Sequence, residues 1–141
     1  MASRPSTGLP PARWRMFFLL PAGLAMLAAL NGGLLLLNLP APVVAWADLH
    51  GILMVVGFLG TLIAMERAVA LRHPLGYVAP ALLGSGALVL LTPLPTRLGQ
   101  LLCIEGALAL CIVYLLLWRR SRDVLVLVQL VGGLHLLFAT L

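Results

Sequence analysis

Five long apolar stretches, separated by short connections, occupy almost the whole of this 141-residue chain. The connections contain proline, glycine or arginine, which interrupt helices or prefer contact with water. Only 9% of the residues are charged, whereas a soluble domain carries about 25%. A protein of this size cannot bury so much apolar surface in a water-soluble core. The sequence therefore predicts an all-α bundle of transmembrane helices.

The apolar stretches predict five spans, each close to the roughly 20 residues that crossing a bilayer requires. Residues 1–15, which are polar, basic and rich in proline, form a predicted cytoplasmic tail. Residues 16–141 form a single predicted bundle, because the first stretch is too long for the apolar part of a cleaved signal peptide. The predicted spans cover residues 16–37, 48–71, 77–94, 98–118 and 123–141.

The arginines predict the orientation of these spans. All nine basic residues are arginine. They gather in the N-terminal tail, around the connection after the second span, and in the connection after the fourth span, with Arg97 as the one exception. Short basic loops remain in the cytoplasm. We therefore expect five spans with the N-terminus in the cytoplasm and the C-terminus outside.

Several classes of function are disfavoured by the sequence. The net charge of +5 does not predict nucleic-acid binding, because the arginines lie between apolar stretches rather than on a soluble basic face. Cys103 and Cys111 lie inside one apolar stretch and lack the CxxC spacing of a metal site. The sequence has no HExxH motif, no phosphate-binding loop and no GxSxG frame, which argues against a hydrolytic enzyme.

Ionisable side chains within the apolar stretches are the candidate functional residues. An ionisable group at the bilayer centre costs about 2.5–3.5 kcal/mol to insert, so it is retained where it has a role. His50 lies near the outer start of the second predicted span. With a rise of 1.5 Å per residue, Glu105 lies about 10 Å inside the fourth span and His135 about 9 Å from the outer end of the fifth. All three fall in the outer half of the membrane, where they could form one site.

The chemistry of these side chains suits a haem iron or a metal ion. A neutral histidine binds either through one ring nitrogen, so His50 is the first candidate ligand and His135 the second. Met54 lies one helical turn from His50 and offers a thioether ligand, while Glu105 is a candidate partner for a ligating histidine. The alternatives are hydrogen bonds between helices for the polar groups and core packing for Met54.

The second predicted span also contains two small-xxx-small patterns, which let helices approach closely. The members of these patterns are Gly57, Gly60, Thr61 and Ala64. Glu66 lies about 27 Å along the same span, near its cytoplasmic end. We expect Glu66 and its neighbour Arg67 to reach the membrane interface or to form ion pairs with nearby loops.

One segment of the chain, residues 50–71, has a recognisable pattern. A histidine opens a helix and is followed by methionine, glycine and phenylalanine at fixed offsets, as His50, Met54, Gly57 and Phe58. This pattern resembles polytopic bacterial membrane proteins related to the NnrS family, which are associated with haem, copper and the response to nitric oxide. The resemblance implies a multi-pass protein of the bacterial cytoplasmic (inner) membrane that binds haem or copper.

The chain departs from that family in two respects. The family pattern has a second histidine and then an acidic residue where this sequence has Ile52 and Leu53. Members of the family are also much longer and have about twice as many transmembrane spans. The departures remove at least one ligand that the resemblance would otherwise imply.

Three hypotheses for function follow. The first is a protein that binds haem or a metal near the outer face, in electron transfer or in a nitric-oxide-related role. The second is a structural or assembly subunit that associates with other membrane subunits or with itself, favoured by short third and fifth spans and by an apolar stretch that continues to Leu141. The third is part of a transporter, because glycine-rich interruptions such as residues 31–33 and 84–86 can mark broken helices. In all three the lipid bilayer is a partner.

Overall fold

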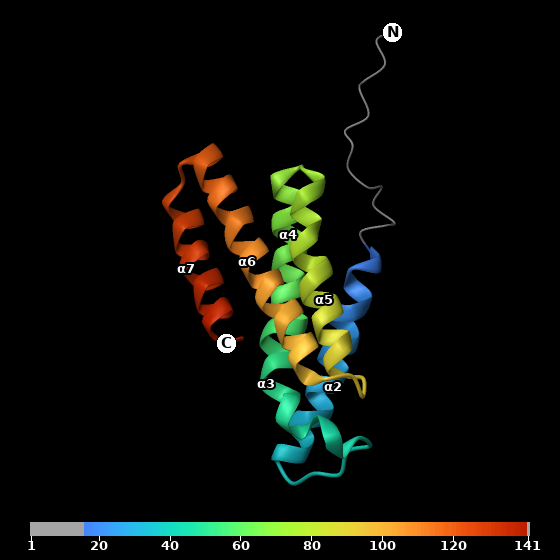
Figure 1. The fold of residues 1–141 in the computed structure, drawn as a ribbon. Coiled ribbons are helices and arrows are strands. Elements are labelled where there is room, and N and C mark those ends of the chain that lie inside the picture. Colours follow the sequence, from blue (N-terminus) through green and yellow to red (C-terminus); the bar gives the residue numbers. More distant parts are fainter. Residues whose placement is uncertain (1–15, 141) are drawn as a thin grey trace.

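A computed structural model describes residues 16–140, and the predicted tail at residues 1–15 lies outside the described residues, as does Leu141. Every regular element in the described part is helical, so the all-α prediction is confirmed there. The helices run alternately up and down through an elongated bundle (Figure 1). In chain order they are α2 (Leu19–Leu36), η1 (Val44–Leu49), α3 (His50–Ile52), η2 (Leu53–Gly60), α4 (Thr61–Leu71), η3 (Pro74–Tyr77), α5 (Val78–Leu90), α6 (Thr96–Ser121) and α7 (Val124–Phe138).

The second predicted span is a composite helix. Four elements, from η1 to α4, continue into one another over residues 44–71. Within them η2 is a π-helix of eight residues that begins at Leu53, three residues after His50. A π-helix has more residues per turn than an α-helix and is frequently found at functional sites.

The helices α4 and α6 end with the same backbone conformation. Arg72 follows α4 with a φ of 54°, and Arg122 follows α6 with a φ of 56°, so both residues are in the left-handed conformation that ends a helix. Next to Arg72, His73 is extended because it precedes Pro74. Each helix therefore stops at an arginine and the chain turns back.

Within residues 16–140, three helices are long and apolar enough to cross a membrane, namely residues 19–36, 44–71 and 96–121. The third and fifth predicted spans are apolar helices as well, but they are shorter. The 15 residues of α7 extend about 22 Å, less than the roughly 30 Å of a hydrocarbon core. The helical architecture is consistent with a membrane protein.

Small residues dominate the core, where α2, η2, α4, α5 and α6 meet. The fully buried alanines are Ala22, Ala25, Ala29, Ala64, Ala68, Ala79, Ala87 and Ala107. Short side chains let helix backbones approach closely, which increases van der Waals contact along their whole length. By contrast, the buried residues of α7 comprise Gly133 alone, and this helix packs mainly against α6.

The connections with arginines lie at the same end of the bundle. Figure 1 shows the α4–α5 and α6–α7 connections at the top of the view, while the α2–η1 connection is at the bottom. Arg72 and residues 119–122 therefore occupy one end, and Arg97, at the start of α6, lies towards the other. The antiparallel path of the helices produces this separation of charge.

Candidate functional site

The ring of His50 is held against α2. His50 is the first residue of α3, it is half-buried, and its Nδ1 lies 2.6 Å from the carbonyl oxygen of Ala29. A carbonyl oxygen only accepts hydrogen bonds, so Nδ1 carries the proton and donates it. This contact is the hydrogen bond between helices that the sequence suggested as the alternative to ligation. In the neutral ring it leaves the Nε2 lone pair for a further partner, and a metal or a haem iron is one such partner.

Two glycines of α2 allow this close approach. A Cβ atom on Gly33 would lie 3.0 Å from Cε1 of His50, and one on Gly32 would lie 2.6 Å from the carbonyl oxygen of Trp46. Both contacts are tighter than ordinary van der Waals separation. The glycine pair, which the sequence suggested as a broken-helix signal, lies within the continuous helix α2 and serves close packing.

Asn31 fixes the loop that leads to His50. Its Nδ2 donates to the carbonyl oxygen of Val43 at 2.6 Å, and its Oδ1 accepts from the Val43 N–H at 3.1 Å. Both main-chain groups of one loop residue are therefore satisfied by one buried side chain. From the sequence, Asn31 was considered only as part of the glycine-rich interruption at residues 31–33. The available signal was a lone amide in an apolar helix, directly before two glycines.

An open, apolar groove of about 580 Å³ lies beside His50. Apart from His50, the lining consists of leucines and one glycine, which belong to α2 or, in the case of Leu37, directly follow it. The groove is lined by Leu30, Gly33, Leu34, Leu36, Leu37 and His50. His50 thus contributes the one titratable group of the described lining. A groove of this size is within the range that binds small ligands and cofactors.

The other candidate ligands lie elsewhere. Met54 is half-buried and packs against the hydrophobic core. Glu105 is exposed on α6, and His135 is exposed on α7, where its Nδ1 contacts the carbonyl oxygen of Val131 in its own helix at 2.8 Å. The described lining of the His50 groove includes none of these three side chains.

The donor groups discriminate between a bare metal ion and haem. Within residues 16–140, no group of three or more His, Cys, Asp or Glu side chains is placed to hold a metal ion. A copper ion held by such side chains of one chain therefore does not fit this part of the protein. One imidazole beside an apolar groove would be enough to hold a haem iron from the protein side, so the residues present are compatible with haem.

The small residues of the second span lie at helix contacts. A Cβ atom on Gly57 would lie 2.8 Å from Cβ of Ala87 and 2.9 Å from Cβ of Ala25, so η2, α2 and α5 meet there. Thr61 and Ala64 are fully buried. The hydroxyl of Thr61 has no hydrogen-bond partner among the described residues.

Gly60 lies on the side of η2 that faces α7. A Cβ atom there would lie 3.3 Å from Cδ2 of Leu136 on α7 and 3.3 Å from the carbonyl oxygen of Val55 in η2 itself. Gly60 also lines a crevice of about 320 Å³ between η2, α4, α6 and α7. The contacts at Gly60 are therefore less tight than the 2.8 and 2.9 Å contacts at Gly57.

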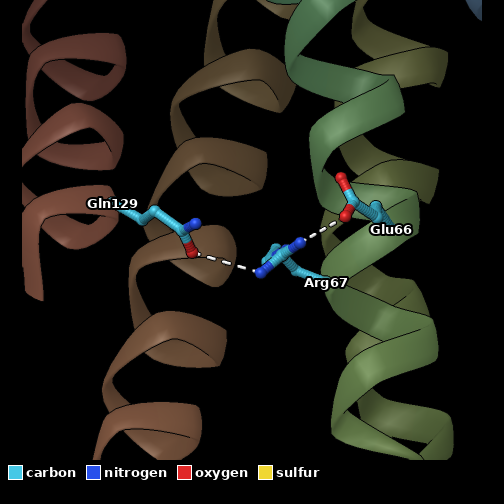
Figure 2. Close-up of polar contacts among 3 residues, drawn as sticks. All are labelled: Glu66, Arg67 and Gln129. Carbon is cyan, nitrogen blue, oxygen red and sulfur yellow. Dashed lines mark hydrogen bonds and ion pairs between the residues drawn. The ribbon is translucent and has the colours of Figure 1, made fainter. Parts of the chain in front are cut away.

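Glu66 and Arg67 form part of a polar link between α4 and α7, which Figure 2 shows. The Arg67 guanidinium forms an ion pair with Glu66 and donates through Nη1 to Oε1 of Gln129 at 3.1 Å. The side chain of Glu66 is 69% exposed and that of Arg67 is 19% exposed. The sequence suggested ion pairs with loops. In the structure Arg67 pairs with its neighbour Glu66, and its partner on another helix is the side-chain amide of Gln129 on α7.

Comparison with known proteins gives a family for this fold. No curated protein and no solved structure matches the chain at a significant level. A family model does match, and it covers residues 15–141, which include all the helices described above. Its description is "Domain of unknown function (DUF8744)". The chain belongs to the DUF8744 family.

Proposed function

We propose that this protein is a multi-pass protein of the bacterial cytoplasmic membrane that binds haem through Nε2 of His50. The observation that carries the proposal is the ring of His50, which is fixed by the Ala29 carbonyl oxygen beside an apolar groove. The role of such a site would be electron transfer or the binding of a small gas such as nitric oxide. The resemblance of residues 50–71 to the NnrS pattern supports the same assignment.

The proposal includes five membrane spans with the arginine-bearing end in the cytoplasm. It is supported by the position of Arg72 and residues 119–122 at one end of the bundle. Reporter fusions in the α4–α5, α5–α6 and α6–α7 connections test this orientation. Alternating cytoplasmic and external signals are expected, and the same signal in adjacent connections would contradict five spans.

The protein's own residues have defined tasks in this site. The hydrogen bond from Nδ1 to Ala29 orients the imidazole and increases its strength as a ligand. The leucines of the groove exclude water, which changes the redox potential and gas affinity of a bound iron. When bound, haem supplies one-electron chemistry and a site for a diatomic gas. The proposal names haem rather than copper, because no group of three or more His, Cys, Asp or Glu side chains is placed to hold an ion within residues 16–140.

Absorption spectra of protein purified from haem-replete membranes in mild detergent test the assignment. The wild type is expected to show a Soret band that shifts on reduction with dithionite, and His50→Ala is expected to lose it. His135→Ala is the matched control, because His135 is exposed and bonds its own helix. A featureless wild-type spectrum with blank metal analysis would refute haem binding, and a band lost only in His135→Ala would move the ligand to α7.

Gly33→Ala provides a finer test of the groove. The added methyl group would lie 3.0 Å from Cε1 of His50 and should displace the ring. A shifted Soret band or reduced haem content is expected, with unchanged helical content by circular dichroism. Gly23→Ala is the control on the same helix, because a Cβ atom there meets nothing within 4 Å. Identical spectra for Gly33→Ala and the wild type would argue against ligation by His50.

A second candidate function is that of an assembly subunit, and the packing of α7 favours it. Gly133 is the buried residue of α7, so this apolar helix is covered on one side only. Residues such as Val128 and Val131 remain 64% and 52% exposed. A stoichiometric membrane partner that co-purifies with haem-free protein, and detaches when these valines are changed to bulky aromatics, would favour assembly over haem binding.

A further inference from the structure

A basic cavity of about 500 Å³, open to the outside, lies at the end of the bundle away from His50, where α4, α6 and α7 meet. Its polar lining consists of Arg67, Arg72, Arg120 and Ser121. Apolar groups, among them Leu117 and Val126, complete the wall. None of the described residues that line this cavity is acidic.

Arginines at the C-terminal ends of two helices line this cavity, and their charge exceeds the partial negative charge of those helix ends. Arg72 ends α4, and Arg120 lies in the last turn of α6, so both are at helix C-termini, where the helix dipole favours cations. Arg67 reaches the cavity from the preceding turns of α4. The arginines therefore converge from two helices that are distant in the sequence.

Nearby carboxylates neutralise only part of this charge. Glu66 forms an ion pair with Arg67, and Asp123 accepts a hydrogen bond from the Leu125 N–H at 2.9 Å, which caps α7. Arg72 and Arg120 are exposed and line the cavity together. The three arginines of the lining outnumber these two carboxylates, so the formal charge around the cavity stays positive.

The aromatic residue Trp118, near this cavity, is of a type that is common at membrane interfaces. The guanidinium of Arg122 lies 5.1 Å from the centre of the Trp118 ring, and tryptophan is enriched where the hydrocarbon core meets the head groups. Beside the cavity, Val124 and Leu125 are 69% and 68% exposed, which provides an apolar surface for acyl chains. The charged cavity and the exposed apolar residues of α7 therefore lie next to each other, as the head group and the acyl chains of a phospholipid do.

We propose that this cavity binds the phosphate of an anionic phospholipid head group in the cytoplasmic leaflet. Arg72 and Arg120 are the main phosphate ligands, because a guanidinium forms two parallel hydrogen bonds with a phosphate. Ser121 adds a hydroxyl donor, and Leu117 and Val126 contact the glycerol region. Basic pockets between membrane helices on the cytoplasmic side recognise anionic lipids in this way. The proposal rests on the membrane orientation given above and is independent of haem binding.

Lipid binding to delipidated protein in detergent, followed by native mass spectrometry, tests this proposal. The ligands are phosphatidylglycerol, phosphatidylcholine with the same acyl chains, and inorganic phosphate. The wild type is expected to prefer phosphatidylglycerol over phosphatidylcholine. The double variant Arg72→Gln with Arg120→Gln is expected to lose about 10- to 30-fold in affinity for phosphatidylglycerol. Each arginine near the head groups contributes about three- to fivefold to the affinity. Its affinity for phosphatidylcholine should stay unchanged.

The matched control is Arg119→Gln combined with Arg97→Gln, which removes the same charge from residues outside the cavity lining. We expect this control to lose less than about threefold, because more distant charges are screened. An equal loss in both double variants would overturn the pocket in favour of general surface charge. Equal binding of the two lipids, or displacement of phosphatidylglycerol by millimolar inorganic phosphate, would overturn the assignment to a lipid.

Size-exclusion profiles and circular dichroism establish that the variants fold, which is expected because Arg72 and Arg120 are exposed. The assay needs no haem, so a blank haem spectrum leaves its outcome unaffected. Conversely, loss of lipid preference in the wild type leaves the spectra of the His50 variants unaffected. The two proposals therefore fail separately.

Discussion

The contact between α5 and α6 differs sharply from the contact between α6 and α7, although glycines occur in both. A Cβ atom on Gly106 of α6 would lie 2.8 Å from the backbone nitrogen of Leu83, and one on Gly86 would lie 2.9 Å from the carbonyl oxygen of Gly99. On α7, a Cβ atom on Gly132 would meet nothing within 4 Å. One interface is formed by backbones in contact, and the other by side chains over a partly open crevice.

The difference teaches that a glycine in an apolar helix does not by itself indicate close packing. Between α5 and α6, glycine removes the side chain that would hold two rigid backbones apart, and dispersion forces act along the whole contact. On α7, Gly132 leaves the helix surface open, whereas a Cβ atom on the adjacent Gly133 would lie 3.3 Å from Sγ of Cys111 on α6. The polar link through Arg67 and Gln129 then supplements the weak packing of α7.

The strongest test of this contrast is Gly106→Ala. The added methyl group would approach a backbone nitrogen, which cannot move away as a side chain can. We expect the free energy of unfolding in detergent to fall by about 2–3 kcal/mol, the upper part of the usual range for overpacking. Denaturant titration followed by circular dichroism measures it. A change below about 0.5 kcal/mol would show that α5 and α6 can separate at little cost.

Gly57→Ala should have the next largest effect. Its methyl group would collide with Cβ of both Ala87 and Ala25, so about 1–3 kcal/mol of stability should be lost. Adding Ala87→Gly removes one of the two collisions and should restore part of the loss. The same titration measures this coupling, and purely additive effects of the two substitutions would indicate that these helices do not meet as described.

Arg67→Gln is expected to have a smaller effect that is confined to α7. The variant loses the hydrogen bond to Gln129, and polar contacts between membrane helices average about 0.6 kcal/mol. Hydrogen exchange should therefore become faster in α7 and stay unchanged in α5. Gln129→Ala should have the same effect, and the double variant should be no worse than either single one. Faster exchange throughout the bundle would contradict a local link.

The smallest effect is expected for Gly132→Ala. The new methyl group meets open space, and alanine favours a helix over glycine by up to about 1 kcal/mol. Thermal unfolding should be unchanged or should shift slightly upwards. A clear destabilisation would show that the crevice beside α7 is closed in the membrane, either by α7 itself or by another chain.

The helices themselves were predictable, because long apolar stretches and their proline, glycine and arginine breaks depend on local chemistry. The five stretches of the prediction are all helical in the described residues. The exact ends of these helices were harder to predict from the sequence. The fourth extends from Thr96 to Ser121 rather than over residues 98–118, and the third ends at Leu90 rather than at residue 94. Capping depends on backbone geometry such as the left-handed turn at Arg122, which a hydropathy pattern does not contain.

The candidate site could be predicted from the sequence only in part. His50 stood out because an imidazole is costly in an apolar helix, and this argument needs no structure. Its contact with Ala29 did not stand out, because the partner is a main-chain oxygen that any residue would offer. The idea of one site shared with Glu105 and His135 came from depth alone. Their side chains do not line the His50 groove, because depth along a helix says nothing about the direction around it.

The sequence by itself determined that this chain is helical, how many apolar stretches it has, and which end collects the arginines, since these properties follow from composition and order along the chain. Only the tertiary structure decided which glycines touch another backbone, which amide meets Arg67, and which arginines surround one cavity. Such contacts join residues far apart in the sequence, and they depend on the rotation of each helix about its axis. That rotation is set by the packing of all the helices together.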